Sequence, residues 1–452
     1  MNSKLFYGAL NVLLCTFLGV QTKAQFALGA QLRTRTELRD GQGAPLPKGA
    51  PPAFFTSQRT RLNIAYTMYR LKFGVSLQDV RVWGQDVSTI NRTTTADNNA
   101  LMLHEAWGEI ALFDSTIKNK ALALKIGRQE LVYDDQRLLG NLDWLQQGRR
   151  HDAAVLKYET GSWMLHLAGA FNQNKEAASG TVYNSTPAGN YPATTNGGTM
   201  YKSMQFLYAG KKLKQGTVSF LFLIDQFSKY KTDTINNVAV KTFNPGSCGR
   251  ATTGFYYNGV LKKFTTTASA YYQFGKTATA QKLSAVLLSG SIQYGVLKKL
   301  NLTAGIDYTS GGTTGTTTNA FDPLYGTPHK FWGLMDYFYA ASPFGKGGLT
   351  DYYLKGKYKA SDKFILSADL HQFNSSTGIS LPDAPAKKNL GQEVDLVGSY
   401  SITKQIGIEA GFAHYFTTAL LTSPAVKNVP DAKSQANWAY VMINIKPEFL
   451  FK

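Results

Sequence analysis

Apolar and polar residues alternate one by one along short segments of this chain. Between Phe26 and Arg39, apolar side chains such as Leu28 and Leu32 occupy even positions, and polar or charged side chains occupy the odd ones. The next segment repeats this, with Leu62, Ile64, Tyr66 and Met68 on one parity and Arg59, Arg61, Asn63 and Thr67 on the other. Because successive side chains of a strand point to opposite faces, each segment predicts a strand with one apolar and one cationic face.

Eighteen segments carry this signal and predict one all-β domain over residues 25–452. The expected strands run over 26–39, 54–68, 71–83, 101–113, 121–133, 149–158, 162–173, 200–210, 216–227, 250–260, 263–275, 282–296, 299–309, 347–359, 362–374, 390–402, 405–416 and 437–447. Many strands of about ten residues with this repeat are typical of membrane barrels. We therefore predict a transmembrane antiparallel up-and-down β-barrel of about 18 strands.

Short and long connections alternate between these strands. The short ones include 69–70, 159–161, 210–216, 261–263, 297–300 and 360–363, and the long ones 134–148, 174–199, 226–249, 310–346 and 417–437. Outer-membrane barrels have short periplasmic turns and longer extracellular loops. Since each short turn follows an even-numbered strand, we expect both termini on the periplasmic side of a bacterial outer membrane. The 310–346 connection is long enough to fold inward.

The first 24 residues have the pattern of a secretory signal peptide, with Lys4, an apolar run over 5–20 and a cleavage site at 22–24. Cys15 lacks the small preceding residue of a lipid attachment site, so we do not expect an anchor there. Without the signal peptide only Cys248 is left, which predicts no intrachain disulfide. No later stretch reaches the roughly 20 continuous apolar residues of a membrane helix.

The formal charge is +19, and arginine and lysine are distributed differently. Many lysines lie in the expected tight turns, where they are solvated beside lipid headgroups. Twelve of the 13 arginines fall between Arg33 and Arg150, several of them within strands. An arginine facing lipid near the midplane costs about 2–4 kcal/mol, so strand arginines are expected to face the lumen or the rim. Their surplus over acids would draw anions into a confined path.

Five arginines of the first two expected strands would form a basic patch in the lumen, namely Arg33, Arg35, Arg39, Arg59 and Arg61, and Arg81 follows on the third strand. Six carboxylates are expected to orient them, namely Glu37, Asp79, Glu105, Glu109, Asp135 and Asp152. The alternation in the third strand slips after Leu77, which indicates a bulge or a change of register. An interleaved lattice of arginine and carboxylate that only fills the barrel remains the alternative interpretation.

Other chemistry is weakly indicated. We interpret Trp83, Trp107, Trp163, Tyr256, Tyr271 and Trp438 as interfacial girdles, with sugar platforms as the alternative. The six histidines show no metal spacing, and turn chemistry or arginine pairing accounts for Asp134, Asp135, Asp143 and Asp152 better than calcium does. No phosphate loop, nucleophile elbow or CxxC occurs. We expect no cofactor, no metal and no catalysis.

The segment from Lys125 to Asp152, KIGRQELVYDDQRLLGNLDWLQQGRRHD, resembles the core motif of the alginate export family of outer-membrane porins. Four further segments are similar to that family: Arg33 to Glu37, Gln78 to Gly84, Phe321 to Phe338 and Gly391 to Tyr400. The resemblance implies an 18-stranded monomeric barrel whose cationic lumen passes a linear polyuronate out of the cell. It also implies a role in the selectivity of the lumen for nine arginines, namely Arg33, Arg35, Arg59, Arg61, Arg81, Arg128, Arg137, Arg149 and Arg150. Two features depart from the pattern: Lys452 after the terminal aromatic, and His151 where an aromatic is usual.

The sequence therefore predicts a passive, anion-selective outer-membrane channel for an anionic, alginate-like polysaccharide. Expected partners are this polysaccharide or another anionic solute, outer-membrane lipid and lipopolysaccharide, and periplasmic export machinery, with no nucleic acid. A general diffusion porin for small anions or sugars has the same kind of wall and is the first alternative. A barrel enzyme acting on lipids and a surface adhesin are less favoured, because neither a nucleophile with its base nor a loop binding motif is visible.

Overall fold

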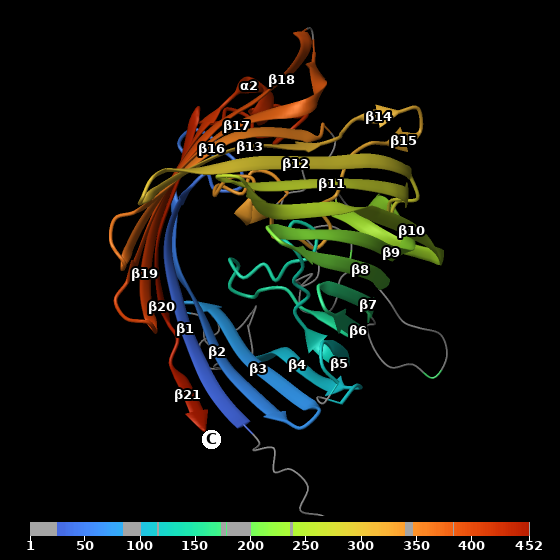
Figure 1. Ribbon diagram of the computed structural model, residues 1–452. Helices are drawn as coiled ribbons and strands as arrows, with labels where there is room; N and C mark the ends of the chain where they lie inside the picture. Colours follow the sequence, from blue (N-terminus) through green and yellow to red (C-terminus); the bar gives the residue numbers. More distant parts are fainter. Residues whose placement is uncertain are drawn as a thin grey trace, which may run out of the picture.

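The alternating segments form strands that close into one antiparallel barrel (Figure 1). The computed structural model describes residues 25–84, 101–114, 117–172, 178, 200–235, 238–339, 347–382 and 384–451. The elements are β1 (Gln25–Asp40), β2 (Ala53–Met68), β3 (Leu71–Val82), β4 (Met102–Ala111), β5 (Lys120–Gln129), β6 (His151–Thr160), β7 (Trp163–Phe171), β8 (Ser203–Leu213), β9 (Gly216–Ile235), β10 (Val238–Leu261), β11 (Phe264–Lys276), β12 (Lys282–Leu297), β13 (Leu300–Thr309), β14 (Thr313–Thr314), β15 (Thr317–Thr318), η1 (Pro328–Lys330), β16 (Leu349–Lys359), β17 (Phe364–Leu381), β18 (Ala384–Ser401), β19 (Ile406–Thr417), α2 (Ala419–Thr422), β20 (Gln435–Ile445) and β21 (Glu448–Phe451).

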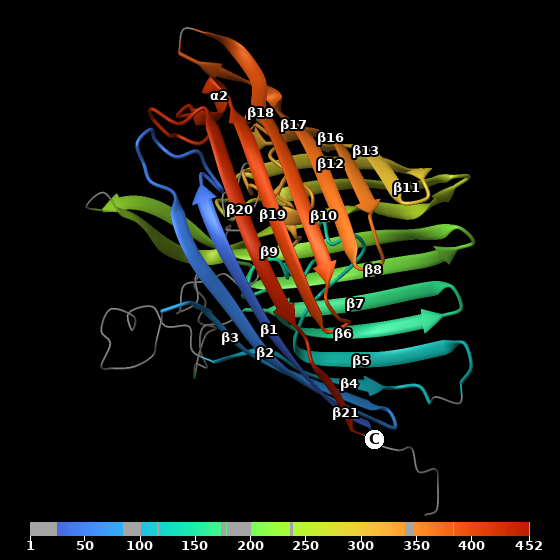
Figure 2. The same ribbon diagram turned by 90° about the vertical axis from the view of Figure 1, so that its left-hand side faces the viewer.

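Eighteen strands form the wall, β1 to β13 and β16 to β20, which confirms the expected number. The barrel closes where β1 pairs with β20 from Leu32 to Asp40. After Lys446 and Pro447, β21 continues along β1, with Phe26 opposite Phe451 (Figure 2). Closure pairs the backbone of both end strands, as a structure in hydrocarbon requires.

The predicted strand boundaries are close except at the long-loop end. There β9 runs to Ile235 and β10 starts at Val238, where a loop over 226–249 was expected. Similarly, β17 and β18 continue to Leu381 and from Ala384 as a projecting hairpin. Over these extensions β9 pairs with β10 and β17 pairs with β18. Both chain ends lie at the other end, because Gln25 pairs with Thr67 beside the turn after β2.

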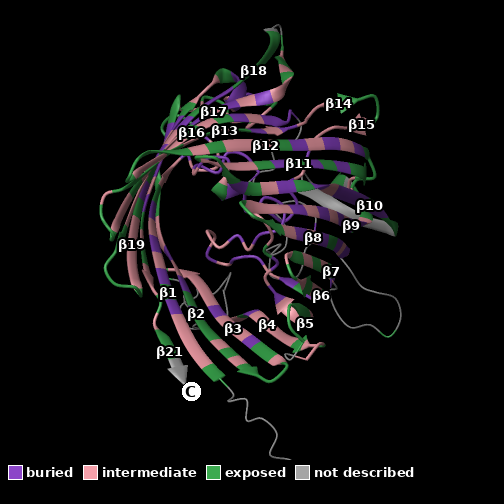
Figure 3. Cartoon of the chain, viewed as in Figure 1, coloured by how far each residue is buried: buried purple, intermediate pink, exposed green. Residues whose placement is uncertain are grey.

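Burial alternates along each strand, as Figure 3 shows. On β12, Leu288 and Ile292 are about half exposed on the outer face, whereas Leu283 and Leu287 are buried inside. The outer residues form the apolar surface expected against lipid, and the inner residues face other protein.

In the described part of the chain, no helix is long and apolar enough to cross a membrane.

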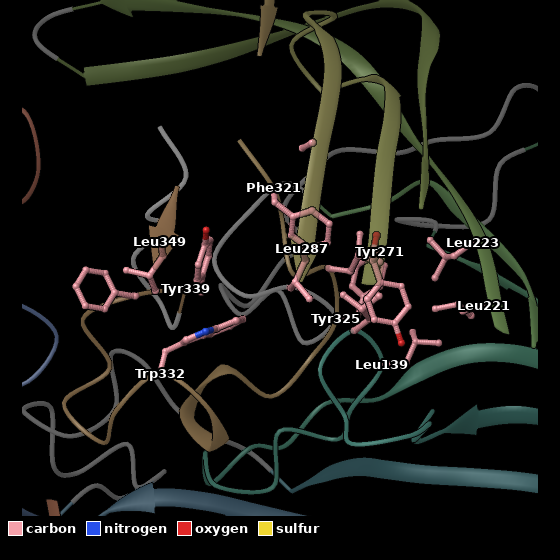
Figure 4. Packing of buried hydrophobic residues seen from close by; sticks show 14 of the residues in the cluster. Leu139, Leu221, Leu223, Tyr271, Leu287, Phe321, Tyr325, Trp332, Tyr339 and Leu349 are labelled. Carbon is pink, nitrogen blue, oxygen red and sulfur yellow. The ribbon is translucent and has the colours of Figure 1, made fainter. Parts of the chain in front are cut away.

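Two long connections fold into the barrel, including the one between β13 and β16 for which this was predicted. We call them the 130–150 loop, between β5 and β6, and the 310–339 segment, after β13. They meet at a parallel bridge between Leu139 and Tyr325. Both belong to one apolar core with inward residues of the wall such as Tyr271 and Leu287 (Figure 4). The wall residues of this inner core come from β6 to β12 and from β16 to β20.

Candidate functional site

Four arginines of the first two strands lie side by side inside the barrel. The register of β1 with β2 places Arg33 opposite Arg59 and Gln31 opposite Arg61, and Arg35 follows on β1. All four are buried, as predicted for lumenal positions. We call Arg33, Arg35, Arg59 and Arg61 the central arginine group.

The tip of the 130–150 loop faces this group and supplies its acceptors. Asp143 lies 3.2 Å from Arg33, 2.8 Å from Arg59 and 3.6 Å from Arg61. Arg35 donates to the Trp144 carbonyl oxygen at 2.9 Å, and its guanidinium lies 4.3 Å from the centre of the Trp144 ring. Burial alone would raise the pKa of Asp143, but the guanidinium groups of Arg59, Arg33 and Arg61 outweigh it and lower that pKa.

Guanidinium groups outnumber carboxylates here. Glu37 accepts from Arg35 and Arg39 at 2.9 Å each, and Arg61 lies 4.0 Å from Glu130. The central arginine group and Arg39 thus face three carboxylates: Glu37, Glu130 and Asp143. A cavity of about 670 Å³ opens beside Arg59, Arg61 and Asp143. The surplus positive charge therefore borders open space.

Three carboxylates of the wall strands β16 and β18 are buried near the 310–339 segment. Glu393 accepts the Met335 N–H at 2.7 Å, and Asp395 accepts the Leu334 N–H at 3.3 Å. Asp351 pairs with His371 at 2.8 Å. All three acids are at most 3% exposed, and none of them lines the cavity beside the central arginine group. Glu393 and Asp395 hold the 310–339 segment in place.

A second basic site lies at the tight-turn end. Glu109 is 2.7 Å from Lys157 and 3.2 Å from Lys72, and these three line a cavity of about 530 Å³. Lys125 lies 3.8 Å from the ring centre of Trp107. The sequence prediction included Glu109 but missed the lysines. For Lys125 and Lys157, the alternation with the apolar Leu124 and Leu156 carried the signal. Glu105 accepts the Glu130 N–H at 3.1 Å.

Two of the predicted arginines tie the 130–150 loop in place. Arg137 pairs with Asp307 at 2.7 Å and with Asp135 at 3.3 Å, which bears out the pairing expected for Asp135. Arg149 donates to the Gly326 carbonyl oxygen, and burial lowers its pKa to about 9. Both contacts join the loop to other parts of the barrel interior.

Asp79 and Arg81 lie on the outer face, contrary to the prediction. They pair with each other at 2.6 Å and stand opposite Thr60 and Gln58, which point away from the lumen. The expected irregularity occurs between Ser76 and Leu77, but the extra residue is His104 on β4. Because β3 itself keeps its parity, these two side chains point outward at the end of the strand.

Arg128 and Asp152 are also on the outer face. They are paired across β5 and β6 at 2.9 Å, whereas their neighbours Gln129 and His151 are buried inside. Arg150 precedes β6, and burial and the nearby charge of Arg128 lower its pKa. A charged side chain on the outer face costs only about 0–1 kcal/mol near a barrel end. A charged residue can therefore lie on the same face as the lipid-facing apolar residues at this position.

The girdle interpretation holds for only part of the aromatic set. Trp83 and Trp163 are exposed on the outside. Three members are instead buried within the barrel: Tyr256, Tyr271 and Trp438. The indole of Trp438 donates to Glu37 at 3.0 Å. Inward aromatic residues pack on the infolded loops, and nothing in a single strand distinguishes this from an interfacial position.

Arg250, the one arginine that follows Arg150 in the sequence, was not in the predicted set and is part of a buried network. It is bound to Asp225 on β9 and lies 2.6 Å from Asp322, and Tyr325 donates to Asp225 at 2.7 Å. Its position within a strand was the available signal. Among the described residues, no group of His, Cys, Asp and Glu is arranged to hold a metal ion.

Comparisons with known proteins agree with this architecture. A family model described as alginate export matches residues 24–431, and no curated protein matches. Acinetobacter baumannii OccAB2 is similar in structure, with 12% identity, a TM-score of 0.58 and coverage of 94% of this chain and 98% of that chain. Pseudomonas aeruginosa OccK5 (OpdH) has 10% identity, a TM-score of 0.58 and the same coverages.

A structure of Pseudomonas aeruginosa OpdK with vanillate has 10% identity, a TM-score of 0.56 and coverage of 94% of this chain and 99% of that chain. At such identities the likeness shows the fold. The family match spans most of the chain, including the arginine-bearing strands and both infolded loops. The chain therefore belongs to the alginate export family, and it is an outer-membrane β-barrel porin of that family.

Proposed function

We propose that this porin is a passive, anion-selective channel that passes a linear uronate polymer out of the cell. The central arginine group beside the cavity carries this proposal. Planar guanidinium groups bind carboxylates by two parallel hydrogen bonds, and their surplus over nearby acids favours anions in a confined path. Both termini are proposed to be periplasmic, because they lie at the tight-turn end of the barrel.

The first test is the ion selectivity of the purified barrel in planar bilayers. Arg59→Gln with Arg61→Gln should shift the reversal potential in a salt gradient toward that of an unselective pore, because these two arginines border the cavity. Arg81→Gln with Arg128→Gln removes the same charge from the outer face and is the matched control. The difference in reversal potential between the wild type and the lumenal variant should shrink near 1 M salt, where the Debye length is about 3 Å. Equal reversal potentials in wild type and the lumenal variant would contradict the proposal.

A general porin for small organic anions is the second candidate. The fold-level relative OpdK has been crystallised with vanillate, a small carboxylate, and the cavity beside Arg59 is of a size for such a solute. The polymer channel and the small-anion porin can be distinguished by how strongly a uronate monomer and a uronate hexamer each block the chloride current. Much stronger block by the hexamer, compared at equal carboxylate concentration, favours polymer passage, and equal block favours the small-anion porin.

A further inference from the structure

Part of the central arginine group already binds a carboxylate that belongs to the chain. Arg33, Arg59 and Arg61 come from directly paired or neighbouring positions of two strands and converge on Asp143. Among the described residues, Asp143 is the one carboxylate that forms an ion pair with Arg33 or with Arg59. Several guanidinium groups around one carboxylate are the arrangement that a bound carboxylate ligand would also adopt.

Asp143 is the accessible member of this cluster. Its side chain is 45% exposed, whereas that of Arg59 is 1% exposed. Arg59 Nε and Arg61 Nη2 are buried and have no hydrogen-bond partner in the described structure. Arg59, Arg61 and Asp143 all line the cavity of about 670 Å³. The arginines are thus held within the wall, and a solute in the cavity reaches the carboxylate first.

The 130–150 loop has other contacts that hold it in place. Arg33 donates to the Leu145 carbonyl oxygen at 3.2 Å and to the Gln146 side chain at 2.9 Å. Gln146 in turn donates to Ser57 at 3.1 Å. Leu139 is buried in the inner core, where it forms the bridge to Tyr325. The Asp143 side chain can therefore move away from the arginines while the rest of the loop remains docked.

We infer that Arg33, Arg59 and Arg61 form a carboxylate-binding subsite that Asp143 occupies at rest, and that a carboxylate of the solute binds by exchanging with Asp143. The inference rests on the proposed function, since an anion-conducting lumen must deliver such a solute. The tethered carboxylate compensates three buried cations when the lumen is empty. It also competes with the solute at high effective concentration and so shortens its stay, as conduction requires.

Asp143→Asn tests this inference through the block of the chloride current. The inference predicts a stronger block, whereas a role of Asp143 in only positioning the arginines predicts a weaker one. Asparagine keeps the size and removes the charged competitor. The concentration of a mannuronate hexamer that halves the chloride current should fall by about fivefold to tenfold, because a charge-assisted competitor is replaced by a neutral one. Asp143→Glu keeps the charge and should behave like wild type. If Asp143 only held the arginines in position, its removal would raise the half-blocking concentration.

Asp322→Asn is the matched control. Asp322 is also a loop carboxylate, 48% exposed and 2.6 Å from a buried arginine, but that arginine is Arg250. Its replacement should leave the block unchanged. Each variant is first shown to form a heat-modifiable barrel, and Asp143→Ser takes the place of Asp143→Asn if insertion is impaired. If the hexamer blocks the wild type but blocks the Asp143 variant equally or less, this inference is wrong and the proposed function still stands. A wild type with neither anion preference nor block overturns the proposed function.

Discussion

At the scale of single residues, guanidinium geometry explains how loops are fixed inside this barrel. Arg250 contacts Asp225 through Nε at 3.0 Å and Asp322 through Nη1 at 2.6 Å. One planar group thus joins a wall strand to the 310–339 segment. A lysine ammonium offers a single point of charge and cannot hold both carboxylates in the same plane. Arg137 makes the corresponding link between Asp135 and Asp307.

One residue-scale prediction concerns Gly74, over which the Trp107 ring lies. A Cβ atom at position 74 would be 2.5 Å from Trp107 Cζ2, so an added methyl group forces the indole and the Lys125 ammonium above it to move. We expect Gly74→Ala to lower the free energy of unfolding by about 1–3 kcal/mol, as overpacking does. Gly108→Ala is the control, because a Cβ there meets nothing within 4 Å. The stability of both variants is measured as the temperature at which half of the heat-modifiable form is lost in detergent. Equal midpoint temperatures for Gly74→Ala and Gly108→Ala would refute the argument.

At the scale of elements, three connections meet at one half-buried lysine. Lys427, between β19 and β20, donates to the Gly43 carbonyl oxygen at 3.0 Å and to the Tyr337 carbonyl oxygen. Gly43 belongs to the connection between β1 and β2, and Tyr337 to the 310–339 segment. Burial lowers the pKa of Lys427 to about 8. The infolded segment is therefore fixed from the same side of the barrel that carries the central arginine group.

The docking of the 130–150 loop should depend on pH through Asp143. Its pKa is lowered in the docked state, because the three arginines outweigh burial. The ion pairs therefore contribute stability above the ordinary carboxyl pKa of about 3.9, and this contribution is lost as the pH falls through the lower docked value. Current fluctuations of single channels should therefore increase as the pH falls below about 4. In Asp143→Asn this added noise should be missing, and an identical pH profile in both proteins would assign the effect to other carboxylates.

At the scale of the whole molecule, the barrel interior is asymmetric. Apolar residues of both infolded loops pack against inward residues of β6 to β12 and of β16 to β20, whereas the larger described cavity lies beside β1 and β2. Glu393 and Asp395 of β18 accept hydrogen bonds from the 310–339 segment. A solute that enters this barrel therefore meets arginine on one side and loop on the other.

Closure by the last strand predicts an all-or-none effect of truncation. Removal of residues 435–452 takes away the partner of β1 over its whole length. Each backbone group left unpaired in hydrocarbon costs several kcal/mol, so the shortened chain should not insert stably into outer membranes. Fractionation followed by unheated gel electrophoresis measures this. The Asp322→Asn protein serves as an insertion control, and a normally inserted truncated chain would show that the barrel closes through other strands.

The sequence by itself determined the strands, their order and the lumenal side of Arg33, Arg35, Arg59 and Arg61. These follow from local alternation, because lipid requires one apolar face on each strand and leaves the other face for charge. Alternation predicted the number of strands but not directly which strands pair at the closure. The pairing of the first strand with the last was predicted only because a barrel with this number of strands has to close. Alternation also predicted the irregularity after Leu77, although not which of the two strands carries the extra residue.

Only the tertiary structure decided what fills the interior. Asp143 reaches the arginines because two loops fold inward and pack on each other, and such contacts join residues more than 80 positions apart. Tyr271 and Trp438 became part of the interior for the same reason. Arg81 and Arg128 face outward because they lie at strand ends, where the surroundings no longer demand an apolar face. Alternation is a local property of a strand, whereas the occupant of a lumen depends on which distant segments pack there.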